Sequence, residues 1–429
     1  MTTDKTITIP IIGASFAGLT TAHSLLSHFT TNKSKGIKIK ILLINPTPNF
    51  YWAIAAPRIL AKPTAFSESQ YLIPIADGFT KYSPEVFEFI LGRATSLDFE
   101  NKLLQVEEST TNNTNKALRE IKYDYLVIAS GSTPSASSSS PLFPGETETE
   151  NKDADRKEVI YPFKLSPTST STITETIQSA QHTISTSKKI TIIGAGPIGV
   201  ELAGELADLT SSASSKEKKD ITLISSTPRI LPVLKESASG TATSLLTSKG
   251  VRVLTNTKVI SVSASKEGGG GYELKFENGE TMDTDIYIPT IGVLPNSSYI
   301  PGEVLDEKGW VRVDSELKVV GVDGVYAAGD VTDCKQKLSF KADEMAGVVV
   351  GNLVNDIDNS AEKGGIGWWR GCSGGRKTYD EGTEVMMVVP VGSSGGTGQA
   401  FGLVLFSFMV WLAKGRDYFI WKARGYVFK

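Results

Sequence analysis

The chain has 429 residues, enough for two or three domains, and its 40% apolar and 21% charged content is ordinary for a globular protein. Its net charge of −3 provides no basic field, so we expect no nucleic-acid partner. The two cysteines, Cys334 and Cys372, and three histidines without ligand spacing argue against a disulfide framework, a dithiol redox site and a metal site.

A glycine-rich turn, Gly13-Ala-Ser-Phe-Ala-Gly18, is the first informative element. It follows an apolar strand at 6–12 and opens a helix, and a second apolar strand at 37–44 completes the unit. Such a turn lets backbone N–H groups approach a pyrophosphate at the positive end of the helix. Two positions depart from the usual pattern: Ser15 replaces the second glycine, and Asn45 stands where an acidic residue normally holds a ribose. Asparagine can still hydrogen-bond a hydroxyl.

The next strand, 123–131, ends in small residues that include Ala129 and Gly131. Small residues at a strand end allow the backbone to lie close to a cofactor. The polar stretch 135–157 then reads as a linker into a second domain.

A second turn, Gly194-Ala-Gly-Pro-Ile-Gly199, repeats the plan between apolar strands at 189–193 and 221–224. A strand ending at Gly292 is the counterpart of the one ending at Gly131. One glycine turn alone would be weak evidence, because the pattern arises by chance. Two of them, about one domain apart in the same context, indicate a chain that binds two dinucleotides.

The strand at 221–224 ends in Ser225 and Ser226, with Arg229 close behind. An acidic residue at this strand end would grip the 2′-hydroxyl of NADH and repel a 2′-phosphate, whereas serines and an arginine tolerate one. We therefore expect that NADPH is accepted. The alternative is that Arg229 lies in a solvated loop.

Further along, 324–330 reads as a short strand that ends in Gly329 and Asp330. A carboxylate at that point can accept a hydrogen bond from a ribityl hydroxyl, which is the role we assign to Asp330. A plain Gly-Asp turn is the alternative.

The stretch 400–413 is apolar all round but too short to span a bilayer, which takes about 20 residues. The aromatic and basic residues that follow it suit a membrane interface; they are Lys414, Arg416, Tyr418, Trp421, Lys422 and Arg424. A buried helix or strand is the alternative. Either way, an apolar wall suits a hydrophobic electron acceptor such as a quinone.

With these features the chain resembles the two-dinucleotide-binding flavoproteins of pyridine nucleotide-disulfide oxidoreductase fold. It looks most like the apoptosis-inducing-factor-2 branch, which includes ferroptosis-suppressor NAD(P)H:quinone oxidoreductases. The most specific segments are 194–205, 329–330, 341–347 and 412–419. The resemblance implies FAD on the first unit, NADPH or NADH on the second, and cofactor contacts for Arg58 and Lys341.

The resemblance also implies three catalytic residues. It places Glu201 close to the nicotinamide and flavin, and Lys414 and Phe419 at the flavin and quinone end. A fixed ammonium near the flavin would stabilise its reduced form or protonate the acceptor. Without the resemblance, Glu201 reads as a favourable first-turn carboxylate and Lys414 as a solvated lysine.

We therefore expect an α/β fold with two Rossmann-like dinucleotide-binding domains, for FAD and NAD(P), and a C-terminal α+β segment. The predicted bounds are 1–150 and 291–358 for the FAD domain, 151–290 for the NAD(P)H domain, and 359–429 for the acceptor and membrane-contact region. The oligomeric state is left open.

The expected function is hydride uptake from NAD(P)H by FAD and electron delivery to a quinone-type acceptor. Two alternatives remain: a soluble reductase that serves a protein such as a ferredoxin or a secondary-metabolite acceptor, and a low-turnover, flavin-bound death-signalling protein. We expect a cytoplasmic location, with peripheral attachment to a membrane or lipid droplet and a mitochondrial location left open.

Overall fold

The computed structural model describes residues 6–31, 37–109, 117–135, 161–164, 172–211, 219–265, 271–362 and 375–429. Cys372 and residues 136–157 of the predicted linker lie outside these ranges.

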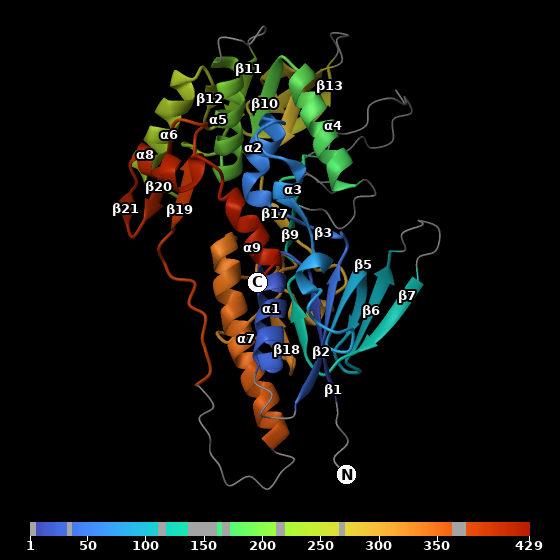
Figure 1. The fold of residues 1–429 in the computed structure, drawn as a ribbon. Coiled ribbons are helices and arrows are strands. Elements are labelled where there is room, and N and C mark those ends of the chain that lie inside the picture. Colours follow the sequence, from blue (N-terminus) through green and yellow to red (C-terminus); the bar gives the residue numbers. More distant parts are fainter. Residues whose placement is uncertain are drawn as a thin grey trace.

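A seven-stranded sheet in the order β18-β8-β1-β2-β5-β6-β7 forms the first unit (Figure 1). Its strands are β1 (Thr6–Ile12), β2 (Lys38–Asn45), β5 (Phe87–Asp98), β6 (Leu103–Glu108), β7 (Ala117–Lys122), β8 (Leu126–Ile128) and β18 (Val325–Ala327). The strands from β18 to β5 are parallel, and β6 and β7 extend the sheet antiparallel. Helix α1 (Phe16–Thr31) packs on β1 and β2 and lies beside α7 (Ser339–Glu362).

The second unit is a parallel four-stranded sheet in the order β12-β11-β10-β16. Its strands are β10 (Lys189–Ile193), β11 (Asp220–Ile224), β12 (Arg252–Leu254) and β16 (Ile286–Pro289). The helices of this unit are α4 (Ile173–Thr186), α5 (Pro197–Ser211) and α6 (Glu236–Ser248). An antiparallel sheet of β13 (Val259–Ala264), β14 (Tyr272–Phe276) and β15 (Thr281–Thr284) lies between β12 and β16 in the chain. The predicted α/β fold with two Rossmann-like units is confirmed.

Two short strands tie the units together. Strand β9 (Ser132–Pro134) follows β8 of the first unit, and β17 (Val293–Pro295) follows β16 of the second, and they pair antiparallel. The pairing brings the carboxyl ends of β8 and β16 close together. Ligands of open α/β sheets bind at this end of the strands, so the connection positions the candidate site.

Both glycine turns depend on the missing side chain. Gly13 has a φ of +105°, and a Cβ there would lie 2.2 Å from the carbonyl oxygen of Ala129. A Cβ on Gly18 would lie 1.8 Å from the Gly13 oxygen, and one on Gly199 would lie 2.0 Å from the Gly194 oxygen. These contacts exclude any side chain, so helix and strand can approach only with glycine at these positions.

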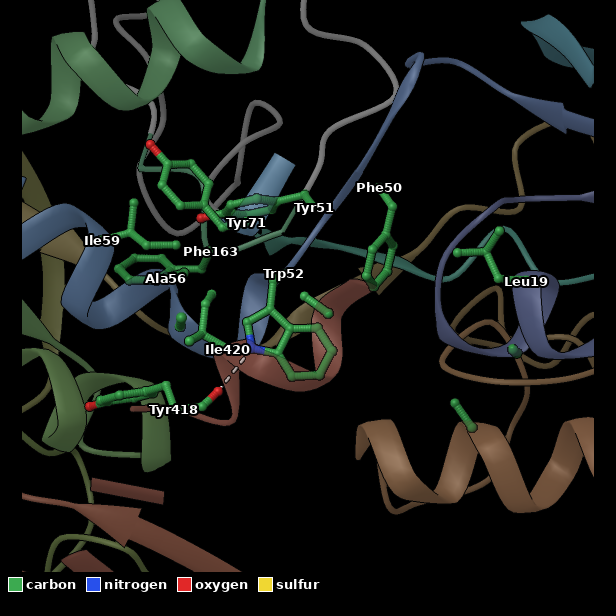
Figure 2. Packing of buried hydrophobic residues seen from close by; sticks show 14 of the residues in the cluster. Leu19, Phe50, Tyr51, Trp52, Ala56, Ile59, Tyr71, Phe163, Tyr418 and Ile420 are labelled. Atoms are coloured by element: carbon green, nitrogen blue, oxygen red, sulfur yellow. Dashed lines mark hydrogen bonds between the residues drawn. The ribbon is translucent and has the colours of Figure 1, made fainter. Parts of the chain in front are cut away.

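A contiguous hydrophobic cluster joins the two units. Figure 2 shows its aromatic part around Trp52, which lies between β3 (Asn49–Tyr51) and α2 (Ala56–Ala61). The Trp52 indole donates a hydrogen bond to the Tyr418 carbonyl oxygen at 2.8 Å. The C-terminal segment is therefore part of the core and is held against the first unit. Two further short elements, α3 (Glu68–Tyr71) and β4 (Leu72–Pro74), complete this region.

The C-terminal part is a small sheet followed by helical turns. Strands β19 (Met387–Pro390) and β20 (Gly396–Ala400) pack on α5 and α6, and α9 (Ala423–Val427) packs on α1. The apolar stretch 400–413 is divided among β21 (Leu403–Val404), α8 (Ser407–Val410) and the π-helical turn η6 (Trp411–Gly415). Its exposed side chains include Phe401, Leu403, Phe406, Phe408 and Leu412. The stretch is therefore not one continuous buried helix or strand: α8 and η6 pack on β20 and β19, and Val410 is buried, but most of the large apolar side chains are exposed.

Candidate active site

The first glycine turn is braced by Asn45 at the end of β2. The Asn45 Oδ1 accepts a hydrogen bond from the Ala14 backbone N at 2.9 Å. Its Nδ2 donates to the Thr47 carbonyl at 2.8 Å and to the Thr47 hydroxyl at 3.0 Å. Ser15 is exposed at the same turn. Asn45 thus holds the turn through hydrogen bonds to protein atoms. Its predicted contact with a ribose stays a prediction.

Two open positions make the turns suitable for a dinucleotide. A Cβ on Gly131, after β8, or on Gly196, in the second turn, would meet no atom within 4 Å. Gly131 has a φ of +71° and Gly292, after β16, one of +56°. At the strand ends where FAD and the nicotinamide nucleotide are expected, no side chain therefore blocks approach to the backbone of these glycines. The residues present fit both groups.

Asp330 lies at the end of β18, beside Ser132 and Lys164. The Ser132 hydroxyl donates to the Asp330 carboxylate at 3.2 Å, and the Lys164 ammonium pairs with the same oxygen. A Cβ built on Gly329 would lie 3.3 Å from the Cβ of Ala17 in α1. The chain at the end of β18 therefore passes close to that helix. Lys164 was not among the residues predicted from the sequence. The available signal was a cation that directly follows three bulky residues, Tyr161-Pro-Phe163, next to a predicted linker.

The second nucleotide strand end is held by local hydrogen bonds. The Ser225 hydroxyl shares a hydrogen bond with Thr227 at 2.8 Å. The Arg229 guanidinium donates to the carbonyls of Leu234 at 2.7 Å and Pro232 at 2.9 Å. Arg229 is thus an ordered part of its loop, with two of its five N–H donors used in these bonds.

Glu201 and Lys414 form a buried ion pair between α5 and η6. The Lys414 ammonium lies 2.5 Å from the Glu201 carboxylate, which is 3% exposed. Burial raises the pKa of Glu201 to about 7, although Lys414 opposes the rise. A carboxyl group with a pKa near neutrality, paired with a fixed cation, is typical of an acid–base site. The structure therefore brings together two of the three predicted catalytic residues, which are 213 positions apart in the chain.

Phe419 and Lys341 lie outside the Glu201–Lys414 pair and contact other residues. Phe419 is half-buried, has a φ of +55° and lies under the Lys422 ammonium, 4.8 Å from the ring centre. Lys341, in the first turn of α7, pairs with Glu344 at 2.9 Å. Their predicted contacts with acceptor and cofactor stay predictions.

Helix α5 carries two more carboxylates beyond Glu201: Glu205, which is fully buried, and Asp208, which is partly buried. Glu205 pairs with Arg58 at 2.7 Å and with Lys62 at 2.8 Å. The next carboxylate, Asp208, is partly buried, and hydrogen bonds from Lys249, the Ser393 N–H and Lys62 outweigh the desolvation and lower its pKa to about 2. The three carboxylates share one helix face because they are four and three residues apart.

Sequence reasoning singled out only Glu201 of these three, although the i, i+4, i+7 spacing of carboxylates in an otherwise apolar helix was a usable signal. In the described parts of the chain, no cluster of three or more His, Cys, Asp or Glu is arranged to hold a metal ion.

Two Rossmann-like sheets with facing strand ends, a glycine turn on each and a buried carboxylate–lysine pair define a two-dinucleotide flavoprotein. Residues 7–349 match the family model of pyridine nucleotide-disulphide oxidoreductases. The chain belongs to this family, and it is an NAD(P)H-dependent flavoprotein oxidoreductase with FAD and NADPH or NADH as cofactors.

Individual relatives agree with this assignment. The chain is 35% identical to oxidoreductase ptaL of Pestalotiopsis fici, over 94% of each chain. It is 24% identical to ferroptosis suppressor protein 1 of Taeniopygia guttata, over 98% of this chain and 97% of that one. The sulfide:quinone oxidoreductase of Aquifex aeolicus shares the fold at a TM-score of 0.69 and 17% identity, covering 98% and 92%. No helix in the described ranges is long and apolar enough to cross a membrane.

Proposed function

We propose that this chain passes electrons from NAD(P)H, through FAD, to a quinone-type acceptor. When bound, FAD supplies the two-electron chemistry between the hydride donor and the acceptor. The observation that carries the proposal is the Glu201–Lys414 pair, buried between a helix of the nucleotide-binding unit and an apolar C-terminal segment. Lys414 holds a positive charge where reduction makes the site more negative, which favours electron uptake and proton delivery.

An acceptor screen tests the proposal. The holoprotein is reduced anaerobically with one equivalent of NADPH and then mixed separately with short-chain quinones, a ferredoxin and aromatic metabolites. We expect rapid reoxidation with quinones. Reoxidation by the ferredoxin or the metabolites alone would favour a soluble reductase, and flavin that NADPH cannot bleach would favour a signalling protein.

Glu201 gives the NADPH step a defined pH dependence. An ionised Glu201 would stabilise the positive charge that hydride transfer leaves on a bound nicotinamide. Because its pKa is raised to about 7, Glu201 becomes ionised as pH rises through about 7. The stopped-flow rate of flavin reduction should therefore rise across that pH. Glu201→Gln cannot ionise, so its profile should be slow and flat there; a variant that keeps the same inflection contradicts the role.

NADPH use is also proposed, on the basis of Ser225 and Arg229. The strand end offers hydroxyls where NADH-specific sites carry an acid, and the ordered Arg229 supplies a positive charge. Arg229→Ala should lower kcat/KM for NADPH about tenfold more than for NADH, as expected for one charge-assisted hydrogen bond. Equal losses with both nucleotides would show that Arg229 only shapes its loop, through its bonds to Leu234 and Pro232.

We further propose that the C-terminal segment binds a lipid bilayer, where quinones dissolve. Phe401 is 78% exposed, Phe406 73% and Trp421 66%. The basic residues Lys422 and Arg424 are exposed in the same segment. Aromatic and basic side chains together match the headgroup region of an anionic membrane.

A flotation assay with anionic lipid vesicles tests this contact. The full chain should float with the vesicles, and the triple variant Phe401→Ser, Phe406→Ser, Trp421→Ser should not. Leu118→Ser is the matched control, because Leu118 is 61% exposed on β7, the edge strand of the first sheet. A wild-type chain that stays at the bottom of the gradient, or a Leu118→Ser chain that loses binding equally, would rule the contact out.

A further inference from the structure

Arg58 lies on α2 and is buried between α5 and the C-terminal segment. Its Nε and Nη2 donate to the two carboxylate oxygens of Glu205 at 3.0 and 2.7 Å. Its Nη2 also donates to the Gly415 carbonyl at 2.7 Å, and its Nη1 to the Arg416 carbonyl at 2.8 Å. Four of its five N–H donors are thus bound to protein atoms. This leaves little of the guanidinium for the cofactor contact that the resemblance implies.

The two carbonyls that Arg58 binds directly follow Lys414 in the chain. Fixing the carbonyls of Gly415 and Arg416 fixes the backbone of the turn from which the Lys414 side chain reaches Glu201. The guanidinium carbon also lies 4.6 Å from the centre of the Tyr418 ring, and the Tyr418 hydroxyl donates to Glu205 at 3.2 Å. Arg58 therefore connects α2, α5 and the turn through one planar group.

The backbone after Lys414 needs such support. Tyr418 and Phe419 have φ values of +51° and +55°, and two consecutive non-glycine residues in the left-handed region are energetically unfavourable. Such a conformation persists only where surrounding contacts hold it. Three sets of hydrogen bonds hold it here. Arg58 donates to the carbonyls of the turn, and the Trp52 indole donates to the Tyr418 carbonyl. The Tyr418 amide donates to the Lys414 carbonyl at 2.7 Å.

We propose that Arg58 is a positioning residue, which acts through the backbone of Gly415 and Arg416 to hold Lys414 against Glu201. The proposal rests on the proposed role of Lys414 in electron delivery. Its first test measures amide exchange in the turn and requires no turnover. The positioning role of Arg58 and the electron-delivery role of Lys414 can therefore fail separately.

Hydrogen–deuterium exchange of the FAD-loaded full chain is the first test. The amides of Arg416 and Tyr418 bond to the Trp411 and Lys414 carbonyls, at 2.8 and 2.7 Å, and report on the turn. In Arg58→Met we expect exchange over 411–419 to be on the order of tenfold faster or more. In Arg58→Lys we expect an intermediate increase, because a lysine keeps the charge but lacks the fork that spans three acceptors.

Lys62 provides the matched control. It lies at the end of the same helix and pairs with the same Glu205, at 2.8 Å, but its other partner is Asp208 and not the C-terminal backbone. Lys62→Met should therefore leave exchange over 411–419 within about twofold of wild type. Wild-type exchange in Arg58→Lys, or equal increases in Arg58→Lys and Lys62→Met, would overturn the proposal.

The pH profile of flavin reduction tests the electrostatic coupling of Arg58 to Glu201, which loss of packing alone would not produce. The charged or titratable groups around Glu201 are Lys414, Glu205, Arg58 and Tyr418; further along α5 lies Asp208, with its partners Lys62 after α2 and Lys249 after α6. The Arg58 charge lowers the pKa of Glu201 and the Glu205 charge raises it. Arg58→Met should move the inflection to higher pH, and Arg58→Met with Glu205→Gln should bring it back toward wild type. An inflection unmoved in both variants would contradict the proposed coupling.

Discussion

Replacing Lys414 with alanine is expected to slow reoxidation of the reduced flavin by quinone about 10²-fold, the scale of one lost positioned acid or electrostatic donor. The Lys414 ammonium is held 2.5 Å from the buried Glu201 carboxylate, so its charge is fixed and poorly screened. Reduction by NADPH should change much less when it is measured at high pH, where Glu201 stays ionised without the Lys414 charge that otherwise lowers its pKa. Stopped-flow measurement of the two half-reactions separates these effects.

The control for this variant is Lys258→Ala. Lys258 also pairs with a glutamate, Glu277, at 2.8 Å, but both side chains are exposed. The substitution removes the same charge and the same kind of ion pair, and both half-reactions should keep their wild-type rates. If Lys414→Ala reoxidises as fast as Lys258→Ala, the C-terminal segment has a structural role only.

Glu205→Ala should lower the free energy of unfolding by about 3–5 kcal/mol, the usual cost of removing one partner from a buried ion pair. Glu205 is fully buried and balances both Arg58 and Lys62. Without it, the buried Arg58 and the partly buried Lys62 lose the carboxylate that they share, and Asp208 and Glu201 compensate only in part.

Urea denaturation of the FAD-saturated chain measures this loss. Glu277→Ala, which breaks the exposed pair with Lys258, serves as the comparison and should cost no more than about 1 kcal/mol. Equal midpoints for the two variants would mean that the carboxylate row on α5 contributes little to the fold.

Local patterns made the two dinucleotide units predictable. The turns at Gly13 and Gly194 are recognisable in the sequence, because a tight turn after an apolar strand needs glycine. The backbone atoms that exclude a side chain at these turns are close by in the chain or follow a neighbouring strand. The parallel pairing of β1 with β2 and of β10 with β11 followed from the same units. Family membership is confirmed by the match over residues 7–349.

The contacts around the Glu201–Lys414 pair were not predictable from local patterns. Arg58 meets Glu205 and Gly415 across 147 and 357 positions, and no periodicity reports such distances. Glu201 and Lys414 were predicted from resemblance alone. The apolar stretch 400–413 has no clear period, so its division into β21, α8 and a π-helical turn could not be predicted.

A single anaerobic double-mixing experiment follows electrons from NADPH through the flavin to a quinone. The yellow holoprotein is first mixed with NADPH and then, after bleaching, with a short-chain quinone, while the flavin absorbance is followed. We expect complete bleaching in the first step and full recovery of the oxidised spectrum in the second, with quinol formed in equal amount. A flavin that bleaches with NADPH and stays reduced in the presence of quinone would contradict the proposed function.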